Sequence, residues 1–146
     1  MLRWKDIIYY AKYGNPEPYH RVDFTEQEWA QKLSPAQYTV MRQKGTEPPY
    51  RNAYCKVFEP GTYLCAACGS LLFNASEKYR AISGWPSFTQ PATKAAIKYS
   101  FDDSHHMQRI EACCNVCDSH LGHVFQDGPE PYGLRYCINS VCLTKL

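Results

Sequence analysis

Two short cysteine pairs, far apart in the chain, constrain its fold more than any other feature. Cys65 and Cys68 form the first C-x-x-C pair, and Cys114 and Cys117 form the second. Each pair can present two thiolates to one ion, so the two pairs complete a closed tetrahedral site with no position left for water. Closed sites of this kind are structural. We therefore predict one structural zinc ion that ties distant parts of one sheet together.

Redox-active C-x-x-C pairs, as in a thiol-disulfide oxidoreductase, and simple buried thiols are the alternatives to a metal site. The N-terminal segment lacks the apolar stretch and cleavage site of a signal peptide, so we expect none. We expect no membrane either, because no apolar run approaches the roughly 20 residues that cross a bilayer. The expected location is the cytoplasm, where cysteines bind metal or carry out chemistry more often than they form disulfides.

The composition fits one globular domain and argues against nucleic acid as a partner. The chain has 146 residues, of which 45% are hydrophobic and 21% charged, an ordinary balance for a domain with a core. The net charge of +2 is too small to indicate binding to nucleic acid. A zinc-ribbon module that binds nucleic acid or a protein would need a basic, aromatic surface, so we expect no nucleic-acid partner.

Helix signals are confined to the N-terminal third of the chain. Thr25 and Glu28 have the spacing of a capping box, which predicts a short helix over about 26–33. Ser34 followed by a proline predicts a second helix over about 35–44. An earlier helix would have to end before the next prolines.

From residue 50 onward, short alternating segments lie between Gly, Pro, Asn and Asp clusters, a pattern typical of antiparallel strands. Residues 135–143 are predicted to form one final strand. The expected fold is mainly β, with two or three short N-terminal helices packed on an antiparallel core. We expect residues 1–24 to be an extension on or near that core, and residues 25–146 to be the main domain.

Cys137 has the neighbours of a nucleophilic thiol. Arg135 and Asn139 lie two residues before and after it, so the three side chains share one face of a strand. A guanidinium beside a thiol lowers its pKa and favours the reactive thiolate. A buried strand cysteine with an unrelated arginine is the alternative, and the spacing alone leaves both open.

Two histidines and an aromatic loop complete the candidate site. His120 and His123 are free for acid–base work if four thiolates already fill the metal site, although a lone histidine is more often at the surface or satisfied in the core. Asp127 lies in a turn that could aim its carboxylate at a histidine. Trp85 lies in a stiff loop that could wall a small apolar pocket or belong to the core.

Four strings of the sequence occur in an order that identifies a family. They are Gly-Trp-Pro-Ser-Phe (84–88), Met-Gln-Arg-Ile-Glu (107–111), His-Leu-Gly-His-Val-Phe (120–125) and Arg-Tyr-Cys-Ile-Asn-Ser (135–140). The two cysteine pairs lie in the expected places between them. From about Thr25 to Leu143 the chain resembles the methionine-R-sulfoxide reductases, the MsrB family.

This resemblance implies two antiparallel sheets in a β-tent-like arrangement, stapled by the four-cysteine zinc. It also implies that the Cys137 thiolate attacks the sulfur of methionine-R-sulfoxide in a protein or peptide and is left as a sulfenic acid. One such enzyme serves one sulfoxide epimer. The activity would repair oxidised proteins, with thioredoxin or another thiol as the reductant.

The resemblance also implies roles for the other site residues. The histidines would assist protonation of the departing oxygen, the arginine would lower the thiol pKa, the carboxylate would orient a histidine or polar group, and the asparagine would help fix the pocket. Besides Cys137, the implied catalytic residues are His120, His123, Asp127, Arg135 and Asn139. The implied substrate contacts are Trp85, against the substrate methyl group, with Phe88, His105 and Phe125.

Ser83 departs from the pattern of many family members, which carry a resolving cysteine at that position. A serine cannot form the disulfide, so another thiol must attack the sulfenic acid. Cys55, on the loop before the first pair, is the first candidate. Cys113 is tied beside a metal ligand, and Cys142 is expected on the face of the strand opposite to Cys137. Direct attack by an external thiol is the remaining alternative.

Overall fold

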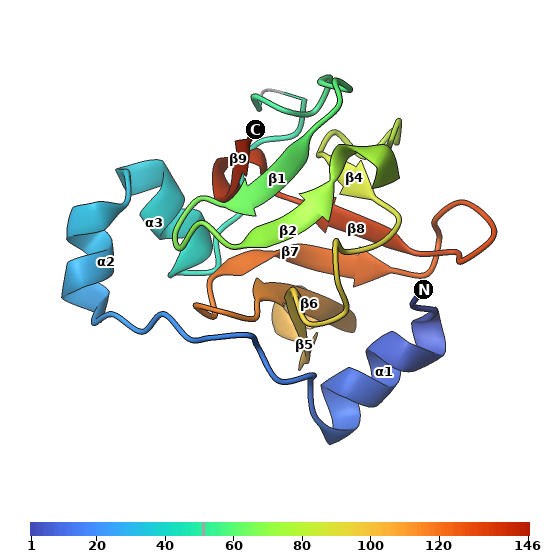
Figure 1. Ribbon diagram of the computed structural model, residues 1–146, viewed down its shortest axis with the longest axis horizontal. Coiled ribbons are helices and arrows are strands. Elements are labelled where there is room, and N and C mark those ends of the chain that lie inside the picture. Colours follow the sequence, from blue (N-terminus) through green and yellow to red (C-terminus); the bar gives the residue numbers. More distant parts are fainter. Residues whose placement is uncertain (51) are drawn as a thin grey trace.

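Helices open the chain in the computed structural model, which describes residues 1–50 and 52–146 (Figure 1). Within these residues three α-helices precede the strands: α1 (Trp4–Tyr13), α2 (Glu26–Lys32) and α3 (Pro35–Met41). The predicted capping box of α2 is formed, since the Thr25 side chain accepts the N–H of Glu28 at 3.1 Å. Ser34 caps α3 in the same way, accepting the N–H of Gln37 at 3.2 Å. No helix in this part of the chain is long and apolar enough to cross a membrane.

Helix α3, predicted over about 35–44, ends earlier than expected, at Met41. Lys44 adopts a left-handed backbone conformation, with φ of 57°. The N–H of Gly45 then bonds to the carbonyl of Thr39 at 3.0 Å, which closes the end of the helix. Gly45 therefore belongs to the turn that ends the helix, as predicted, but residues 42–44 of that turn already lie outside α3.

The strands of the described chain form two antiparallel sheets, as the sequence predicts. The smaller sheet has the order β2 (Leu71–Asn74), β1 (Thr62–Cys65), β9 (Leu143–Lys145). The larger sheet has the order β3 (Lys78–Tyr79), β4 (Ser87–Phe88), β8 (Arg135–Ile138), β7 (His120–Phe125), β6 (Arg109–Cys114), β5 (Ile97–Asp102). The expected mainly β fold with short N-terminal helices is therefore confirmed.

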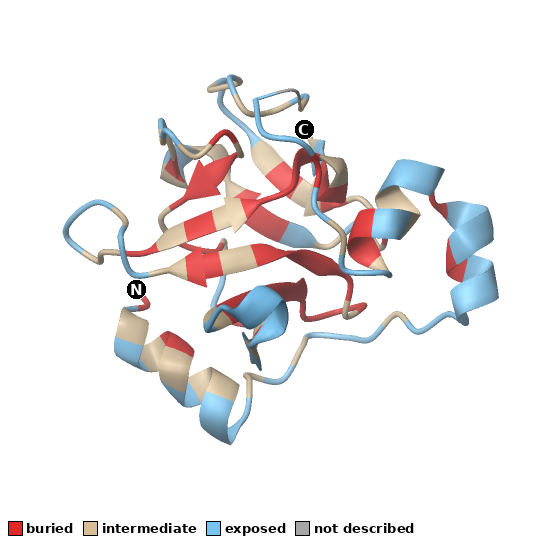
Figure 2. Ribbon diagram, turned by 180° about the vertical axis from the view of Figure 1, so that it is seen from behind, coloured by how far each residue is buried: buried red, intermediate tan, exposed pale blue. Residues whose placement is uncertain are grey.

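Aromatic side chains from both sheets build the core between them. Phe73 of β2 stacks on Phe88 of β4, with ring centroids 4.3 Å apart. Phe73 also meets the ring of Tyr136 edge-on at 5.6 Å, and the Tyr136 hydroxyl bonds to that of Tyr99 at 2.6 Å. Figure 2 shows buried residues gathered in the strands, whereas helix α2 is largely exposed and α1 and α3 mix exposed and partly buried residues. Because strand side chains alternate, Cys137 and its neighbours at odd positions of β8 point away from this core.

The predicted single strand over 135–143 is wrong, because the chain changes sheets within it. β8 ends at Ile138, a 3-10 turn covers Ser140–Cys142, and β9 pairs with β1 in the other sheet. The buried carboxylate of Glu47 fixes this turn by accepting the backbone N–H groups of Ser140 and Val141 at 2.6 and 2.9 Å. Cys142 is therefore separated from Cys137 by a change of sheet.

The N-terminal segment packs against the edge strand of the larger sheet. Ile7 of α1 is fully buried, and the ring of Tyr10 stacks on that of Tyr99 in β5 at 6.0 Å. The side chain of Asn15 accepts the backbone N–H of Tyr99 at 2.7 Å and donates to its carbonyl at 3.0 Å. Figure 1 shows α1 lying beside β5 and β6. This helix thus covers part of the larger sheet, and the same sheet carries the candidate site.

Candidate functional site

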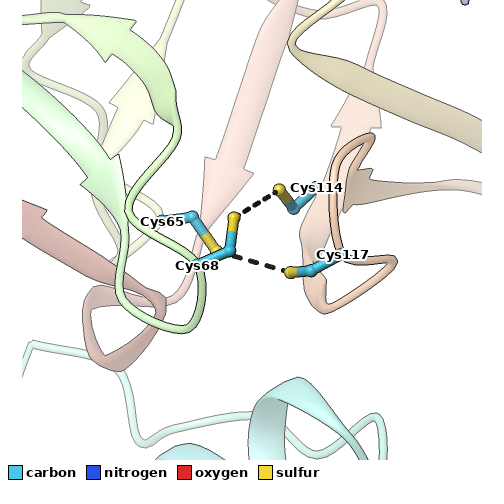
Figure 3. A group of neighbouring side chains, drawn as sticks. All are labelled: Cys65, Cys68, Cys114 and Cys117. Atoms are coloured by element: carbon cyan, nitrogen blue, oxygen red, sulfur yellow. Dashed lines mark hydrogen bonds between the residues drawn. The ribbon is translucent and has the colours of Figure 1, made fainter. Parts of the chain in front are cut away.

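The four cysteines predicted to bind metal meet where the two sheets come together. Their sulfur atoms all lie within 4.8 Å of one another (Figure 3). Cys65 and Cys117 have sulfurs 3.8 Å apart, and those of Cys68 and Cys114 are 3.6 Å apart. A tetrahedral zinc ion with Zn–S bonds of about 2.3 Å requires sulfurs about 3.8 Å apart. The cluster therefore has the size and the donor set that a zinc ion needs.

Each cysteine pair sits on a tight turn at the end of a strand. Gly69 and Asp118 follow the two pairs with left-handed φ angles of 82° and 64°. Their N–H groups bond back to the carbonyls of Cys65 and Cys114, both at 2.8 Å. The side chain of Asp118 is held in turn by Arg21, whose Nη2 lies 2.6 Å from its Oδ2.

The cluster joins two sheets, so the prediction that it ties distant parts of one sheet together is wrong. Cys65 ends β1 of the smaller sheet, and Cys114 ends β6 of the larger one. Helix α3 is attached to the same corner, since Arg42 donates to the carbonyl of Cys117 at 2.8 Å and to the Ser119 hydroxyl at 3.2 Å. A bound ion would thus fix how the sheets and this helix meet.

A cavity of about 260 Å³ opens on the outer face of the larger sheet and exposes the thiol of Cys137. The predicted site residues that line it are Trp85, His123, Phe125, Arg135, Cys137 and Asn139. The structure adds Thr46, Ser83, Arg109 and Gly122 to this lining. The predicted thiol, arginine, asparagine, one histidine and two aromatic rings are therefore brought together.

The strand register explains why these side chains meet. His123 of β7 lies opposite Cys137 of β8, and Phe125 lies opposite Arg135. Opposite residues of an antiparallel pair point to the same face. The position before His123 must be a glycine, because a Cβ on Gly122 would lie 2.0 Å from the carbonyl oxygen of Cys137.

Glu47 organises the cavity from the loop after α3, and the sequence analysis did not identify it. Its backbone carbonyl accepts the indole N–H of Trp85 at 3.0 Å, and its N–H donates to the side chain of Asn139 at 3.0 Å. The amide of Asn139 also donates to the carbonyl of Leu121 at 2.9 Å. Glu47 is 6% exposed. A charged residue in a proline-rich loop gives no sequence signal for such burial.

Two opposing effects act on the Cys137 thiol. Burial raises its pKa above the ordinary value, while the positive charge of Arg135 and the hydroxyl of Ser83 act to lower it. Burial is the larger effect, so the pKa of the thiol is raised overall, although Arg135 acts in the expected direction. Arg135 is held by Asp127, with Nε 2.7 Å from Oδ1, and its guanidinium lies 4.3 Å from the centre of the Phe125 ring.

The two histidines have carboxylate partners that the sequence analysis missed. Nε2 of His123 lies 2.7 Å from Oδ2 of Asp102, and Nδ1 of His120 lies 2.7 Å from Oε2 of Glu111. Asp127 is bonded to Arg135, so of its two expected partners it orients a polar group and not a histidine. The partners could not be found by spacing, because they come from other strands: Glu111 from β6, next to β7, and Asp102 from β5, one strand further away.

Burial outweighs the Asp102 contact in its effect on the pKa of the cavity histidine. Burial lowers the pKa of His123 below its ordinary value, and the carboxylate of Asp102 only partly opposes this. Burial also acts against the charged form of Asp102, but hydrogen bonds from His123 and from the backbone of Ser104 hold its pKa well below the usual range. The pair is therefore a neutral imidazole that donates Nε2–H to a carboxylate, which leaves Nδ1 as a proton acceptor.

Five predicted site residues do not line this cavity, and one of them is Asp127, which lies behind Arg135 as its hydrogen-bond partner. Phe88 is fully buried in the core against Phe73, because it occupies the inward-facing position next to Ser87, so its expected substrate contact is wrong. His120 is 4% exposed and lies behind His123, with ring centroids 5.5 Å apart. His105 lies in an exposed turn, Ser104–His106. Cys55 is half-buried in the loop before β1.

Comparison with known proteins gives one consistent result. The SelR domain matches residues 33–145. A peptide methionine sulfoxide reductase MsrB from Cellvibrio japonicus is 54% identical over 120 residues, which cover 82% of this chain and 86% of the relative. Proteins with the same name from Leptospira interrogans and Acinetobacter baylyi are 49% and 50% identical, covering 85% and 84% of this chain and 95% and 88% of the relatives.

The opposing effects on Cys137 generate a prediction for its reactivity. Arg135→Met removes the charge that lowers the thiol pKa, so the pKa rises and the thiolate forms at higher pH. We expect the rate of iodoacetamide alkylation at Cys137, followed by peptide mass spectrometry, to shift by about one unit toward high pH. Lys98→Met, which removes a cation bonded to Asp118, is the control and should leave the profile in place. An unchanged profile in Arg135→Met would contradict the assignment.

Proposed function

The chain belongs to the SelR family of peptide methionine sulfoxide reductases, and we propose that it reduces the R epimer of methionine sulfoxide in proteins and peptides, so repairing oxidised proteins. The observation that carries this proposal is the cavity that gathers the Cys137 thiol, the neutral His123 and the Trp85 indole. The reductase domain comprises residues 25–146 in this proposal, with residues 1–24 as an extension packed on its core.

The first chemical step oxidises Cys137 and reduces the substrate sulfur. The thiol gives up its proton, and the thiolate attacks the sulfoxide sulfur, which forms a sulfur–sulfur bond. The sulfoxide oxygen gains two protons and leaves as water as the sulfur–oxygen bond breaks. A water molecule then attacks the sulfur of Cys137, the sulfur–sulfur bond breaks, and methionine leaves with the electron pair. Cys137 is left as a sulfenic acid, so the substrate sulfur is reduced by two electrons and the cysteine sulfur is oxidised by two.

His123 supports the movement of the proton in this step. Because burial raises the pKa of Cys137, the thiol needs a base to become a nucleophile. Nδ1 of His123 has that capacity, since Nε2 is bonded to Asp102. The histidine would take the thiol proton and then give it to the sulfoxide oxygen. His120, bonded to Glu111, would act by supporting the His123 ring against which it packs.

The walls of the cavity support recognition of a chiral sulfoxide. The indole of Trp85 is fixed by its hydrogen bond to Glu47, so it offers a rigid apolar surface to the substrate methyl group. Phe125, under the guanidinium of Arg135, offers a second aromatic surface. The volume of about 260 Å³ suits one side chain rather than a larger ligand. A fixed pocket of this kind distinguishes one epimer from the other.

The four-cysteine cluster would hold a structural zinc ion. Four thiolates fill a tetrahedral coordination sphere, so the ion supplies rigidity and takes no part in the reaction at Cys137. Cysteines bind metal as thiolates, so they must be reduced and not paired in disulfides. This requirement supports a reducing compartment such as the cytoplasm for the protein.

A second thiol must then remove the sulfenic acid, and Cys55 is our proposed resolver. Cys113 and Cys142 are buried, and burial raises the pKa of Cys142 well above its usual range. The loop that carries Cys55 touches the cavity loop, because the N–H of Tyr50 bonds to the carbonyl of Gly84 at 2.7 Å. Attack by the Cys55 thiol would form a disulfide with Cys137 and release water. Thioredoxin or another dithiol would then reduce that disulfide.

We expect the protein to convert methionine-R-sulfoxide peptides to methionine with dithiothreitol as the reductant, and to leave the S epimer unchanged. Cys137→Ser should lower the rate at least a thousandfold, because the nucleophile is lost. Chromatographic separation of substrate and product measures both. A thermal unfolding curve of the variant checks that it is folded. Turnover of R-sulfoxide by Cys137→Ser at the wild-type rate, or preference for the S epimer, would contradict the proposal.

The resolving step has its own test. Reduced protein treated with one equivalent of methionine-R-sulfoxide should yield a Cys55–Cys137 disulfide, detected by peptide mapping. Cys55→Ser should instead accumulate the sulfenic acid, which dimedone traps. Cys142→Ser is the matched control, since a serine there can still donate to the carbonyl of His120 as the thiol does. Sulfenic acid that persists in the wild type while Cys55 stays free would exclude Cys55 as the resolver.

A further inference from the structure

Three further side chains that can bind metal meet on the larger sheet, apart from the four-cysteine cluster. They are Glu111 and Cys113 of β6 and His120 of β7. Their ligand atoms all lie within 4.8 Å of one another. All three residues are more than nine-tenths buried, with exposed fractions of 4%, 9% and 4%. A carboxylate, a thiol and an imidazole are thus gathered away from water.

An irregularity in the pairing of β6 with β7 brings these side chains together. Glu111 lies opposite His123, whereas Cys113 lies opposite His120, so a step of two residues on β6 matches a step of three on β7. A bulge of this kind places an extra residue in one strand. The two histidines therefore face the same side of the sheet although they are three positions apart. Nδ1 of His120 then lies 2.7 Å from Oε2 of Glu111.

Cys113 does not belong to the four-cysteine cluster, although it precedes one of its members. Neighbouring residues of a strand point to opposite faces. Cys114 turns to the cluster, where its sulfur lies 3.6 Å from that of Cys68. Cys113 turns instead to Glu111 and His120. The two groups of ligands therefore lie on opposite faces of β6 and share no residue.

We propose that Glu111, Cys113 and His120 form a second metal site, which takes an exchangeable divalent cation of the zinc class. Thiolate sulfur, imidazole nitrogen and carboxylate oxygen are the donors that zinc accepts, whereas magnesium and calcium require oxygen ligands. The thiolate and the carboxylate together balance the charge of the ion. Three protein ligands leave one tetrahedral position to water, so this ion can exchange, unlike one enclosed by four thiolates.

The geometry needs a small adjustment to receive the ion. Zinc bonds to nitrogen and oxygen place these two atoms about 3.3 Å apart at a tetrahedral angle. The contact of 2.7 Å between His120 and Glu111 would therefore open by about 0.6 Å. Loss of that hydrogen bond and the smaller number of ligands make this site weaker than the four-cysteine cluster. We therefore expect the isolated protein to keep only the ion of the cluster and to fill the second site when metal is added.

Two lysines lie near the three ligands and leave them accessible to a cation. Nζ of Lys44 lies 3.4 Å from Oε1 of Glu111, the oxygen that His120 does not contact. The side chain of Lys44 is 71% exposed, so it can move into water when a cation binds, since exposed ion pairs are weak. Lys98 lies opposite Cys113, but its ammonium bonds to Asp118 at 3.2 Å. These charges weaken the binding of a cation without taking the place of one.

Cobalt(II) is the probe for this site, because cobalt bound to a thiolate absorbs in the near ultraviolet and zinc does not. Cobalt is added to Cys137→Ser protein, in which the cavity thiol cannot bind it. We expect the thiolate-to-cobalt band to saturate at about one equivalent per chain, and excess zinc to remove it. Cys113→Ser in the same background should lose the band. Glu111→Gln should weaken cobalt binding at least about tenfold.

Cys142→Ser, which alters another buried thiol, is the matched control and should keep both the band and the affinity. Zinc content and the thermal unfolding midpoint of each variant show whether the fold and the cluster are intact. Should Cys137→Ser not fold, the wild type and Cys113→Ser are compared directly, and their cobalt uptake should differ by about one equivalent per chain.

A cobalt band that survives Cys113→Ser at unchanged affinity would overturn the proposal, as would the absence of a band in folded Cys137→Ser protein. Release of zinc in step with the growth of the band would also overturn it, because cobalt would then be entering the four-cysteine cluster. These measurements do not use the reductase activity, so failure of the second metal site is a separate result from failure of the proposed function.

Discussion

The sulfur atoms of two distant cysteine pairs meet at one corner of the molecule, where the ends of β1 and β6 come together. No backbone pairing joins the two sheets at this corner, because β1 pairs with β2 and β9 and β6 pairs with β5 and β7. Four thiolates this close repel one another unless a cation neutralises them. A single ion there would fix the angle at which the sheets enclose the aromatic core, and that core sets the position of β8 and its thiol.

The second constraint is the buried carboxylate of Glu47. It accepts the two N–H groups that begin the turn after β8, and its own backbone holds the Trp85 indole and the Asn139 amide. One residue from a loop thus determines where β8 ends, how the chain passes to the other sheet, and how two cavity side chains are oriented. Burial of that charge is costly unless it is fully hydrogen-bonded, and the turn provides the donors.

The sequence predicts the local features of this molecule well and the long-range ones poorly. The helix caps at Thr25 and Ser34 and the two turns that carry the clustered cysteines follow from spacing, because each depends on residues a few positions apart. The contacts between strands do not follow from spacing, so the sequence gives no sign that Asp102 and Glu111 are the partners of the histidines. The inward position of Phe88 depends on where β4 enters the sheet. The break between β8 and β9 depends on Glu47, which lies far away in the chain.

Metal content and unfolding, measured together, show whether the four cysteines hold the two sheets in place through an ion. We expect one zinc ion per chain by mass spectrometry of the purified protein, and a single cooperative thermal transition. Cys68→Ser should lose both the metal and the cooperative transition, since structural zinc in small zinc-finger peptides contributes about 10–16 kcal/mol. Cys113→Ser, which changes the residue next to Cys114, should keep both. Cooperative unfolding of Cys68→Ser at the wild-type temperature, without bound metal, would show that the fold does not depend on the ion.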